Sequence, residues 1–229
     1  MSKSSACSIS KSSVSLGSLF IFLNLLIAES SITLSEILPS KKASVLAQKT
    51  DKDPRLVELI LRESKKVVRF RKGVIVVEHK LGFIHANAGI DRSNIESDSL
   101  NPRVLLLPKN PDLSAQQLQK ELSKFLRKKV GVIINDSTGR AWRNGIVGIA
   151  IGCSGVSVLS DLRGQKDLYG KTLEVTEVGI ADELASSASI LMGQSNEGLP
   201  VVIIQGLKLS NDKRGSKALL RLAKDDLFR

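Results

Sequence analysis

The chain has 229 residues, enough for one large domain or two small ones. Its formal net charge is +11, which favours an anionic partner such as a nucleotide, a nucleic acid or an acidic lipid headgroup. Aromatic residues make up only 3% of the chain, which argues against base stacking. Two cysteines and two histidines argue against a zinc site, a disulfide framework and a histidine-based triad. A basic face that meets only solvent explains the charge equally well.

The first 33 residues differ in character from the rest. Residues 1–15 are rich in serine, and residues 16–28 form an apolar run. The run is shorter than the roughly 20 apolar residues that a transmembrane helix needs, so we expect no stable membrane association. A weakly basic start followed by an apolar middle is also typical of a signal peptide.

Helices and strands are expected to mix from Thr33 onward. Asp53 and Pro54 suit a helix start, and apolar residues follow at helical spacing as far as Val67. Ser114 to Gln117 matches a capping box, which predicts a helix through residue 128. Short apolar or β-branched runs predict strands at residues 73–77, 83–86, 103–108 and 130–134.

The second half of the chain continues this mixture. Residues 145–158 are apolar and punctuated by glycine, as in close-packed strands or a buried helix. A polar loop at 161–170, a half-buried strand at 173–178, a helix at 180–192 and a last strand at 200–205 are expected. The fold class is therefore α+β, with mixed sheets and packed helices. The sequence carries no P-loop and no Rossmann fingerprint.

Two predicted strands end in loops of similar chemistry. One loop carries Asp91 and Arg92, and the other carries Asp136, Ser137 and Arg140. Oxygen ligands of this kind hold hard divalent cations, which in turn bridge phosphates, so the pair predicts a metal–phosphate site. Ordinary turns stabilised by Asn and Asp are the alternative interpretation. The loop at 193–198 could bring bare backbone to a phosphate, although it also suits a simple turn.

Together these segments resemble the coenzyme F420-0:L-glutamate ligase family, also called F420 gamma-glutamyl ligases. The resemblance runs from about residue 34 to the end of the chain. The matching stretches are residues 52–55, 63–64, 86–94, 106–108, 135–145, 167–170, 181–185, 191–193 and 226–229.

The resemblance implies the family's α+β fold and a GTP-dependent ligase activity. Such an enzyme adds L-glutamate to the deazaflavin precursor coenzyme F420-0, and then adds further glutamates through gamma linkages. The implied route passes through an acyl phosphate. A cytoplasmic homodimer that binds no nucleic acid is implied as well.

The resemblance also implies site residues. Asp91 and Asp136 would hold one Mn²⁺ or Mg²⁺, Ser137 and Gln194 would serve a second, and K⁺ is a further candidate ion. Residues expected to contact GTP are Asn94, Met192, Gly193, Gln194, Ser195, Asn196, Glu197, Gly198 and Leu199. We further predict Arg92, Arg140 and Arg143 as clamps for phosphate or carboxylate groups, with ordinary surface ion pairs as the alternative.

The family pattern begins with a strand–helix–strand unit that residues 1–33 do not show. We therefore expect two parts, a non-family segment at 1–33 and a ligase-like domain at 34–229. This first segment is predicted to be poorly packed or a lone helix. GTP binding by the whole chain is therefore predicted to be weak or absent. An inactive relative that keeps the fold is thus a second hypothesis, and a basic nucleic-acid-binding module is a third.

Overall fold

The computed structural model describes residues 18–23, 31–97, 101–207 and 214–227, and it confirms the predicted α+β class. The helices are α1 (Lys41–Thr50), α2 (Pro54–Arg62), α3 (Pro111–Leu126) and α4 (Ile180–Met192). Short 3-10 turns are η1 (Leu34–Glu36), η2 (Asn87–Gly89), η3 (Ser216–Leu219) and η4 (Ala223–Asp225). The strands are β1 (Ser18–Leu23), β2 (Ser31–Thr33), β3 (Ser64–Arg71), β4 (Val74–His79), β5 (Ile84–Ala86), β6 (Arg103–Leu105), β7 (Val130–Gly139), β8 (Ile146–Ser154), β9 (Ser160–Asp161), β10 (Glu177–Val178) and β11 (Val201–Leu207).

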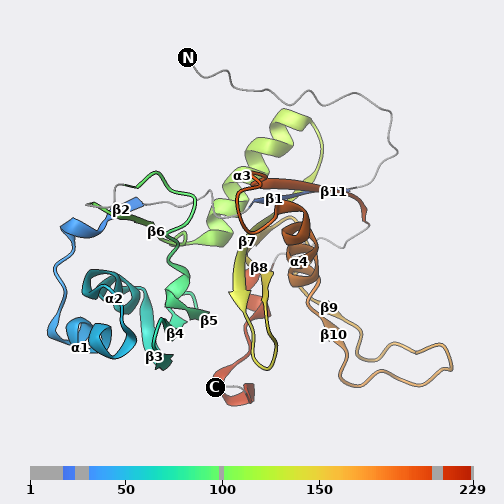
Figure 1. Ribbon diagram of the computed structural model, residues 1–229. Helices are drawn as coiled ribbons and strands as arrows, with labels where there is room; N and C mark the ends of the chain where they lie inside the picture. Colours follow the sequence, from blue (N-terminus) through green and yellow to red (C-terminus); the bar gives the residue numbers. More distant parts are fainter. Residues whose placement is uncertain (1–17, 24–30, 98–100, 208–213, 228–229) are drawn as a thin grey trace.

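A four-stranded sheet in the order β11-β1-β7-β8 forms one half of the structure (Figure 1). Helix α3 packs on one face of this sheet and α4 on the other, so β7 is covered on both sides. Successive β7 side chains alternate accordingly. Ile133 joins the cluster around α4, whereas Val132 and Ile134 join the cluster around α3. This explains why β7 begins as an unbroken apolar run.

The other half packs α1 and α2 on the antiparallel sheet β3-β4-β5 (Figure 1). Alternate residues of β4 are buried, and Ile75 and Val77 join the helices in one apolar cluster. The predicted start of α2 is confirmed, because Asp53 Oδ1 accepts a hydrogen bond from the Arg55 amide at 2.8 Å and Pro54 opens the helix. The predicted extent to Val67 is wrong, because α2 ends at Arg62 and Val67 pairs with Val77 in strand β3. Strand β5 contacts β7 and so joins the two halves beside the candidate site.

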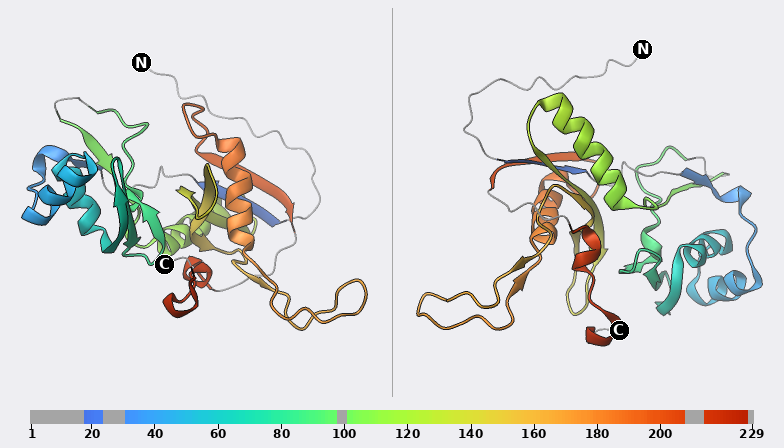
Figure 2. Two further views of the ribbon diagram at one scale, coloured as in Figure 1. Left: turned by 60° about the horizontal axis from the view of Figure 1, so that its bottom comes forward. Right: turned by 180° about the vertical axis from the view of Figure 1, so that it is seen from behind.

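Strands β9 and β10 form the base of a long arm that projects from the rest of the structure (Figure 2). The predicted half-buried strand at 173–178 is wrong over most of its length, since only Glu177–Val178 pairs in a sheet. Val175 is 86% exposed, because no other described element packs against the arm at this point.

Two element boundaries differ from the prediction. Helix α3 begins at Pro111 rather than at Ser114, because the Asn110 side chain caps the helix by accepting from the Leu113 amide at 3.1 Å. Strand β7 does not end at Ile134. It continues through a bulge after that residue to Gly139, so the segment predicted as a loop pairs with β8.

The N-terminal segment also departs from the prediction of poor packing or a lone helix. Within its described part, Ser18–Leu23 is a strand that pairs antiparallel with β11 and parallel with β7. Ser31–Thr33 pairs with β6. A short apolar run suits a strand covered on both faces as well as it suits a helix, and here sheet pairing decides between them. No helix in the described part of the chain is long and apolar enough to cross a membrane.

Candidate active site

A pocket of about 770 Å³ lies where β5, η2, β7 and the loop after α4 meet. It gathers every residue predicted to hold a metal or to contact GTP. These residues are Asp91, Asn94, Asp136, Ser137, Met192, Gly193, Gln194, Ser195, Asn196, Glu197, Gly198 and Leu199. Segments about a hundred residues apart in the chain thus form one site.

Asp91 follows η2 and is held at the pocket wall by its backbone. Its amide donates to the Leu105 carbonyl at 3.1 Å, and the Leu105 amide donates back at 2.9 Å. Its side-chain Oδ1 accepts from both the amide and the hydroxyl of Ser93, at 2.8 and 2.7 Å. The turn interpretation therefore holds locally. Asp91 still lines the pocket, and its Oδ2 has no hydrogen bond with a described residue.

Asp136 lies just beyond the β7 bulge and is buried. Its Oδ1 accepts from the Ser137 amide at 2.8 Å, and its Oδ2 lies 3.0 Å from His85 Nε2. His85 Nδ1 lies 2.9 Å from the Ala86 carbonyl oxygen, which can only accept, so Nδ1 carries a proton. Burial disfavours the imidazolium, but the hydrogen bond and the charge of Asp136 outweigh it and raise the pKa of His85.

His85 was not predicted as a site residue. It sits in a strand too short to show alternation, and its importance depends on β5 lying against β7. The one available signal in the sequence was the position of His85, a polar residue immediately before the motif that carries Asp91.

The loop after α4 is closed by its own side chains. Gly193 has a φ of +76°, and a Cβ at this position would lie 2.1 Å from the Glu197 carboxyl carbon. Glu197 Oε2 accepts from the Ser195 amide at 2.8 Å, and this hydrogen bond lowers the pKa of Glu197. The loop therefore needs glycine at its first position.

Side-chain hydrogen bonds tie this loop to both aspartate-bearing segments. Asn94 Nδ2 donates to the Ser195 carbonyl at 2.9 Å. Ser137 Oγ donates to Gln194 Oε1 at 2.6 Å, and Gln194 Nε2 donates to Ser189 Oγ at 2.8 Å. The three segments thus form one connected polar wall.

The oxygen atoms of this wall fit a hard divalent cation. Asp136 Oδ2 is buried, and His85 Nε2 at 3.0 Å is its one polar neighbour among the described residues. The described residues contain no cluster of three or more His, Cys, Asp or Glu suited to a metal. One or two carboxylates with neutral oxygens suit Mg²⁺ or Mn²⁺ that also binds a substrate phosphate. An ion on Asp136 Oδ2 would compete with His85 for that atom.

The three predicted arginine clamps do not line the pocket. Arg92 is exposed and lies near Lys52, whose pKa is lowered by burial and by the charge of Arg92. Arg140 and Arg143 lie in the exposed turn between β7 and β8. Their role as clamps stays a prediction.

Comparison with known proteins identifies the chain as a ligase by class. Residues 28–206 match the profile of the family described as F420-0:Gamma-glutamyl ligase, and the chain belongs to this family. It is 50% identical over 194 residues to the coenzyme F420:L-glutamate ligase of Methanocaldococcus jannaschii, covering 85% of this chain and 76% of that protein. The proteins of the same name from Methanopyrus kandleri and Methanothermobacter thermautotrophicus are 46% and 45% identical, over 86% of this chain and 79% and 78% of theirs. The predicted family is thereby confirmed.

Proposed function

We propose that this chain is a GTP-dependent ligase that adds L-glutamate to coenzyme F420-0 and then extends the product through gamma linkages. The observation that carries the proposal is the single pocket that unites Asp91, Asp136 and the loop after α4. The relatives named coenzyme F420:L-glutamate ligase support the choice of substrates.

The pocket's own residues support the proposal of nucleotide binding. Gly193 and Gly198 both have positive φ, which lets the backbone of this loop approach phosphate groups closely. Asn94 fixes the loop through Ser195 and offers its side chain to the nucleotide. Positioning of this kind is most of what phosphoryl transfer needs.

Asp91 and Asp136 would hold Mn²⁺ or Mg²⁺, with Ser137 and Gln194 beside a second ion. Such ions, when bound, would neutralise the charge of the phosphate groups. In the proposed reaction the acceptor carboxylate oxygen bonds to the γ-phosphorus of GTP as the bond to GDP breaks. The neutral amine of L-glutamate then attacks the acyl carbon, an amide forms and phosphate leaves.

The test uses the purified full chain with GTP, Mn²⁺, KCl, L-glutamate and coenzyme F420-0. Mass spectrometry should show the precursor gaining one glutamyl residue and then more, with one GDP formed per addition. GTP binding without product would favour the inactive-relative hypothesis. We also propose a homodimer, and sedimentation equilibrium of the same sample would show a mass twice that of the chain.

A further inference from the structure

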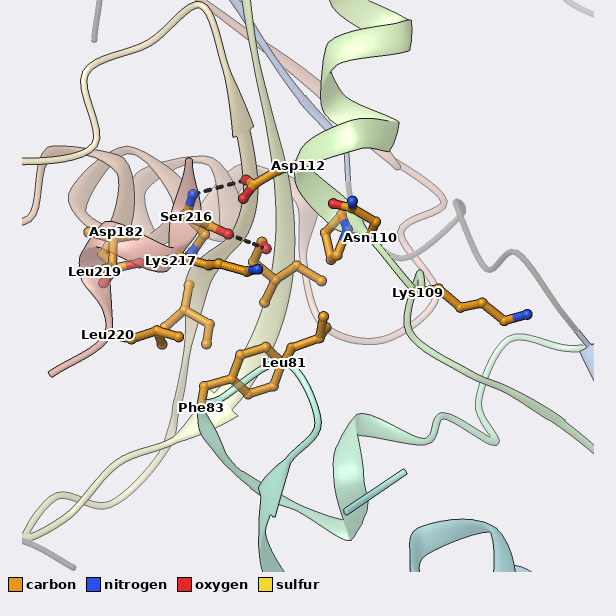
Figure 3. Close-up of a pocket in the computed structure, with 14 residues that line it drawn as sticks. Leu81, Phe83, Lys109, Asn110, Asp112, Asp182, Ser216, Lys217, Leu219 and Leu220 are labelled. Carbon is orange, nitrogen blue, oxygen red and sulfur yellow. Dashed lines mark hydrogen bonds between the residues drawn. The ribbon is translucent and has the colours of Figure 1, made fainter. Parts of the chain in front are cut away.

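A second cavity of about 270 Å³ shares no lining residue with the candidate active site. Figure 3 shows the residues that line it. Its walls come from β8, the start of α3, the start of α4, the turn between β4 and β5, and the C-terminal η3 segment. Two contacts place it next to the first pocket. Ile149 in its wall is the cross-strand partner of Asp136, and the Phe83 ring meets the His85 ring edge-on at 5.9 Å.

The C-terminal wall of this cavity is anchored by specific hydrogen bonds. The Ser216 amide donates to Asp112 Oδ1 at 2.9 Å, and Ser216 Oγ donates to the Ile151 carbonyl at 2.8 Å (Figure 3). The Cys153 amide donates to the same Asp112 oxygen at 2.8 Å. These bonds fix the neighbouring residue, Lys217, at the wall of the cavity.

Lys217 is a cation without an internal counterion. The residue is exposed, its side chain makes no hydrogen bond or ion pair with any described residue, and Figure 3 shows its amine end extending over the cavity. Leu81 and Phe83 face it from the β4–β5 turn. An ammonium group beside apolar walls is a favourable partner for the carboxylate of a small ligand.

Asp182 supplies the opposite charge on the wall of the same cavity. Its Oδ1 accepts from the Ala150 amide at 2.9 Å, and its Oδ2 has no hydrogen bond with a described residue. Burial raises the pKa of this carboxyl group because it disfavours the charged carboxylate, and a cationic ligand group would stabilise that carboxylate. Asp112, the other wall carboxylate, is already engaged by two backbone amides through Oδ1.

We propose that this cavity binds the amino-acid substrate, with a carboxylate of L-glutamate at Lys217 and its ammonium group at Asp182. The inference rests on the proposed function and deepens it by assigning one substrate to a separate chamber. The cavity volume of about 270 Å³ is below the roughly 300–1,000 Å³ of pockets for drug-sized ligands, which suits an amino acid better than a nucleotide or a deazaflavin. Its wall adjoins the first pocket, because Ile149 is the cross-strand partner of Asp136.

The test measures the Kd of two probes, L-glutamate and glutarate, which lacks the amine. Saturation-transfer NMR is recorded on the full chain, with and without Mg²⁺ and a non-hydrolysable GTP analogue. Lys217→Met should weaken both probes by about five- to tenfold, the range expected for loss of one partly exposed charged contact. Asp182→Asn, which retains an acceptor for the Ala150 amide, should weaken L-glutamate and leave glutarate unchanged.

Two further variants complete the design. Lys217→Arg should bind L-glutamate nearly as the wild type does, because the charge is kept. Lys224 lies in the same C-terminal segment but outside the cavity wall. The Lys224→Met variant should therefore bind both probes with the Kd values of the wild type.

The outcomes separate this inference from the proposed function. If the chain ligates glutamate while Lys217→Met and Asp182→Asn keep the wild-type Kd and KM for glutamate, the cavity assignment is wrong and the ligase proposal stands. If glutamate binds and both variants weaken it, but no ligation occurs, the site stands and the ligase proposal fails. Absence of L-glutamate binding to the wild type under both conditions overturns the cavity assignment.

Discussion

Asp136 combines burial with an incomplete set of partners. Its Oδ2 has only His85 beside it, and the described residues around it supply few other charged groups. We predict that Asp136→Asn lowers metal-dependent GTP turnover by about a hundredfold or more, because a metal ligand contributes several kcal/mol of charge stabilisation. GTP turnover is measured against Mn²⁺ concentration.

The amide side chain of the Asp136→Asn variant would retain an oxygen for the Ser137 amide, so we expect its far-UV circular dichroism to be unchanged. Asp161→Asn serves as the control, since this carboxylate is paired with Arg163 on the projecting arm. Equal metal dependence in Asp136→Asn and wild type would rule out Asp136 as a ligand.

His79 is a buried imidazole whose neighbours favour its neutral form. The Leu81 amide donates to its Nδ1 at 3.0 Å, so that nitrogen must remain unprotonated to accept. Burial, followed by the charges of His85, Lys80 and Lys65, lowers the pKa of His79 to about 4. Glu63 lies 3.9 Å from Nε2, too far to offset these effects through a hydrogen bond.

This lowered pKa predicts a loss of stability in mild acid. The unfolded chain takes up a proton near pH 6.5 and the folded chain only near pH 4, so His79 lowers the free energy of unfolding as pH falls through that interval. The loss reaches roughly 3 kcal/mol at most, from 1.36 kcal/mol per unit of pKa. In urea unfolding, the His79→Gln variant should be less stable than wild type at pH 7. Its free energy of unfolding should fall less than that of wild type between pH 7 and pH 5. An equal drop in both proteins would contradict the assignment.

At the scale of elements, the loop after α4 allows a matched pair of glycine substitutions. Gly193 and Gly198 both have positive φ, but only Gly193 has a neighbour, Glu197, where a Cβ would stand. Gly193→Ala should therefore raise the KM for GTP by about tenfold, and clearly more than Gly198→Ala. Gly193 has φ 76° and ψ 179°, a combination essentially restricted to glycine, so the alanine adds backbone strain as well as the clash with Glu197. Steady-state kinetics with GTP and with glutamate varied in turn give the measurement. If Gly193→Ala raised the KM for GTP and the KM for glutamate equally, the loop would not have a phosphate-binding role.

The sequence predicted elements well where a local signal was strong. Helix α2 has a capping aspartate and a proline at its start, and the buried residues of α4 recur at helical spacing and are apolar except for Ser189. Helix α1 was missed, because it carries little apolar surface. The start of β3 was predicted wrongly as a continuation of α2 to Val67, because β3 is an edge strand rich in Lys and Arg. Charged residues of this kind protect a sheet edge and hide the alternation that identifies a strand.

The candidate site was predictable in its residues and less so in its geometry. Asp91, Asp136 and the glycine-bounded loop carry motifs that can be read in the chain. The His85 contact depends on β5 packing against β7, and the second cavity depends on Asp112 holding Ser216, 104 positions away. Long-range packing of this kind leaves no local pattern in the sequence.

At the scale of the whole molecule, β1 joins the N-terminal part of the chain to the sheet that carries Asp136. It lies between β11 and β7 in the strand order, and Ile21 is buried in the cluster beneath α3. The cross-strand partner of Ile21 is Ile203, which is 45% exposed on the edge strand β11. The two isoleucines therefore share a sheet face and differ in burial.

This pair tests whether the N-terminal strand belongs to the folded core. We predict that Ile21→Ala lowers the free energy of unfolding by about 2–5 kcal/mol, as expected for a large-to-small change in a packed core. Ile203→Ala should cost roughly 1 kcal/mol or less, because its side chain already meets solvent over much of its surface. Urea unfolding followed by circular dichroism gives both values under the same conditions. If Ile21→Ala costs no more than Ile203→Ala, β1 does not contribute to the core and the first segment is poorly packed, as its sequence had suggested. A large difference would instead make this strand a structural support for β7, and therefore for the position of Asp136.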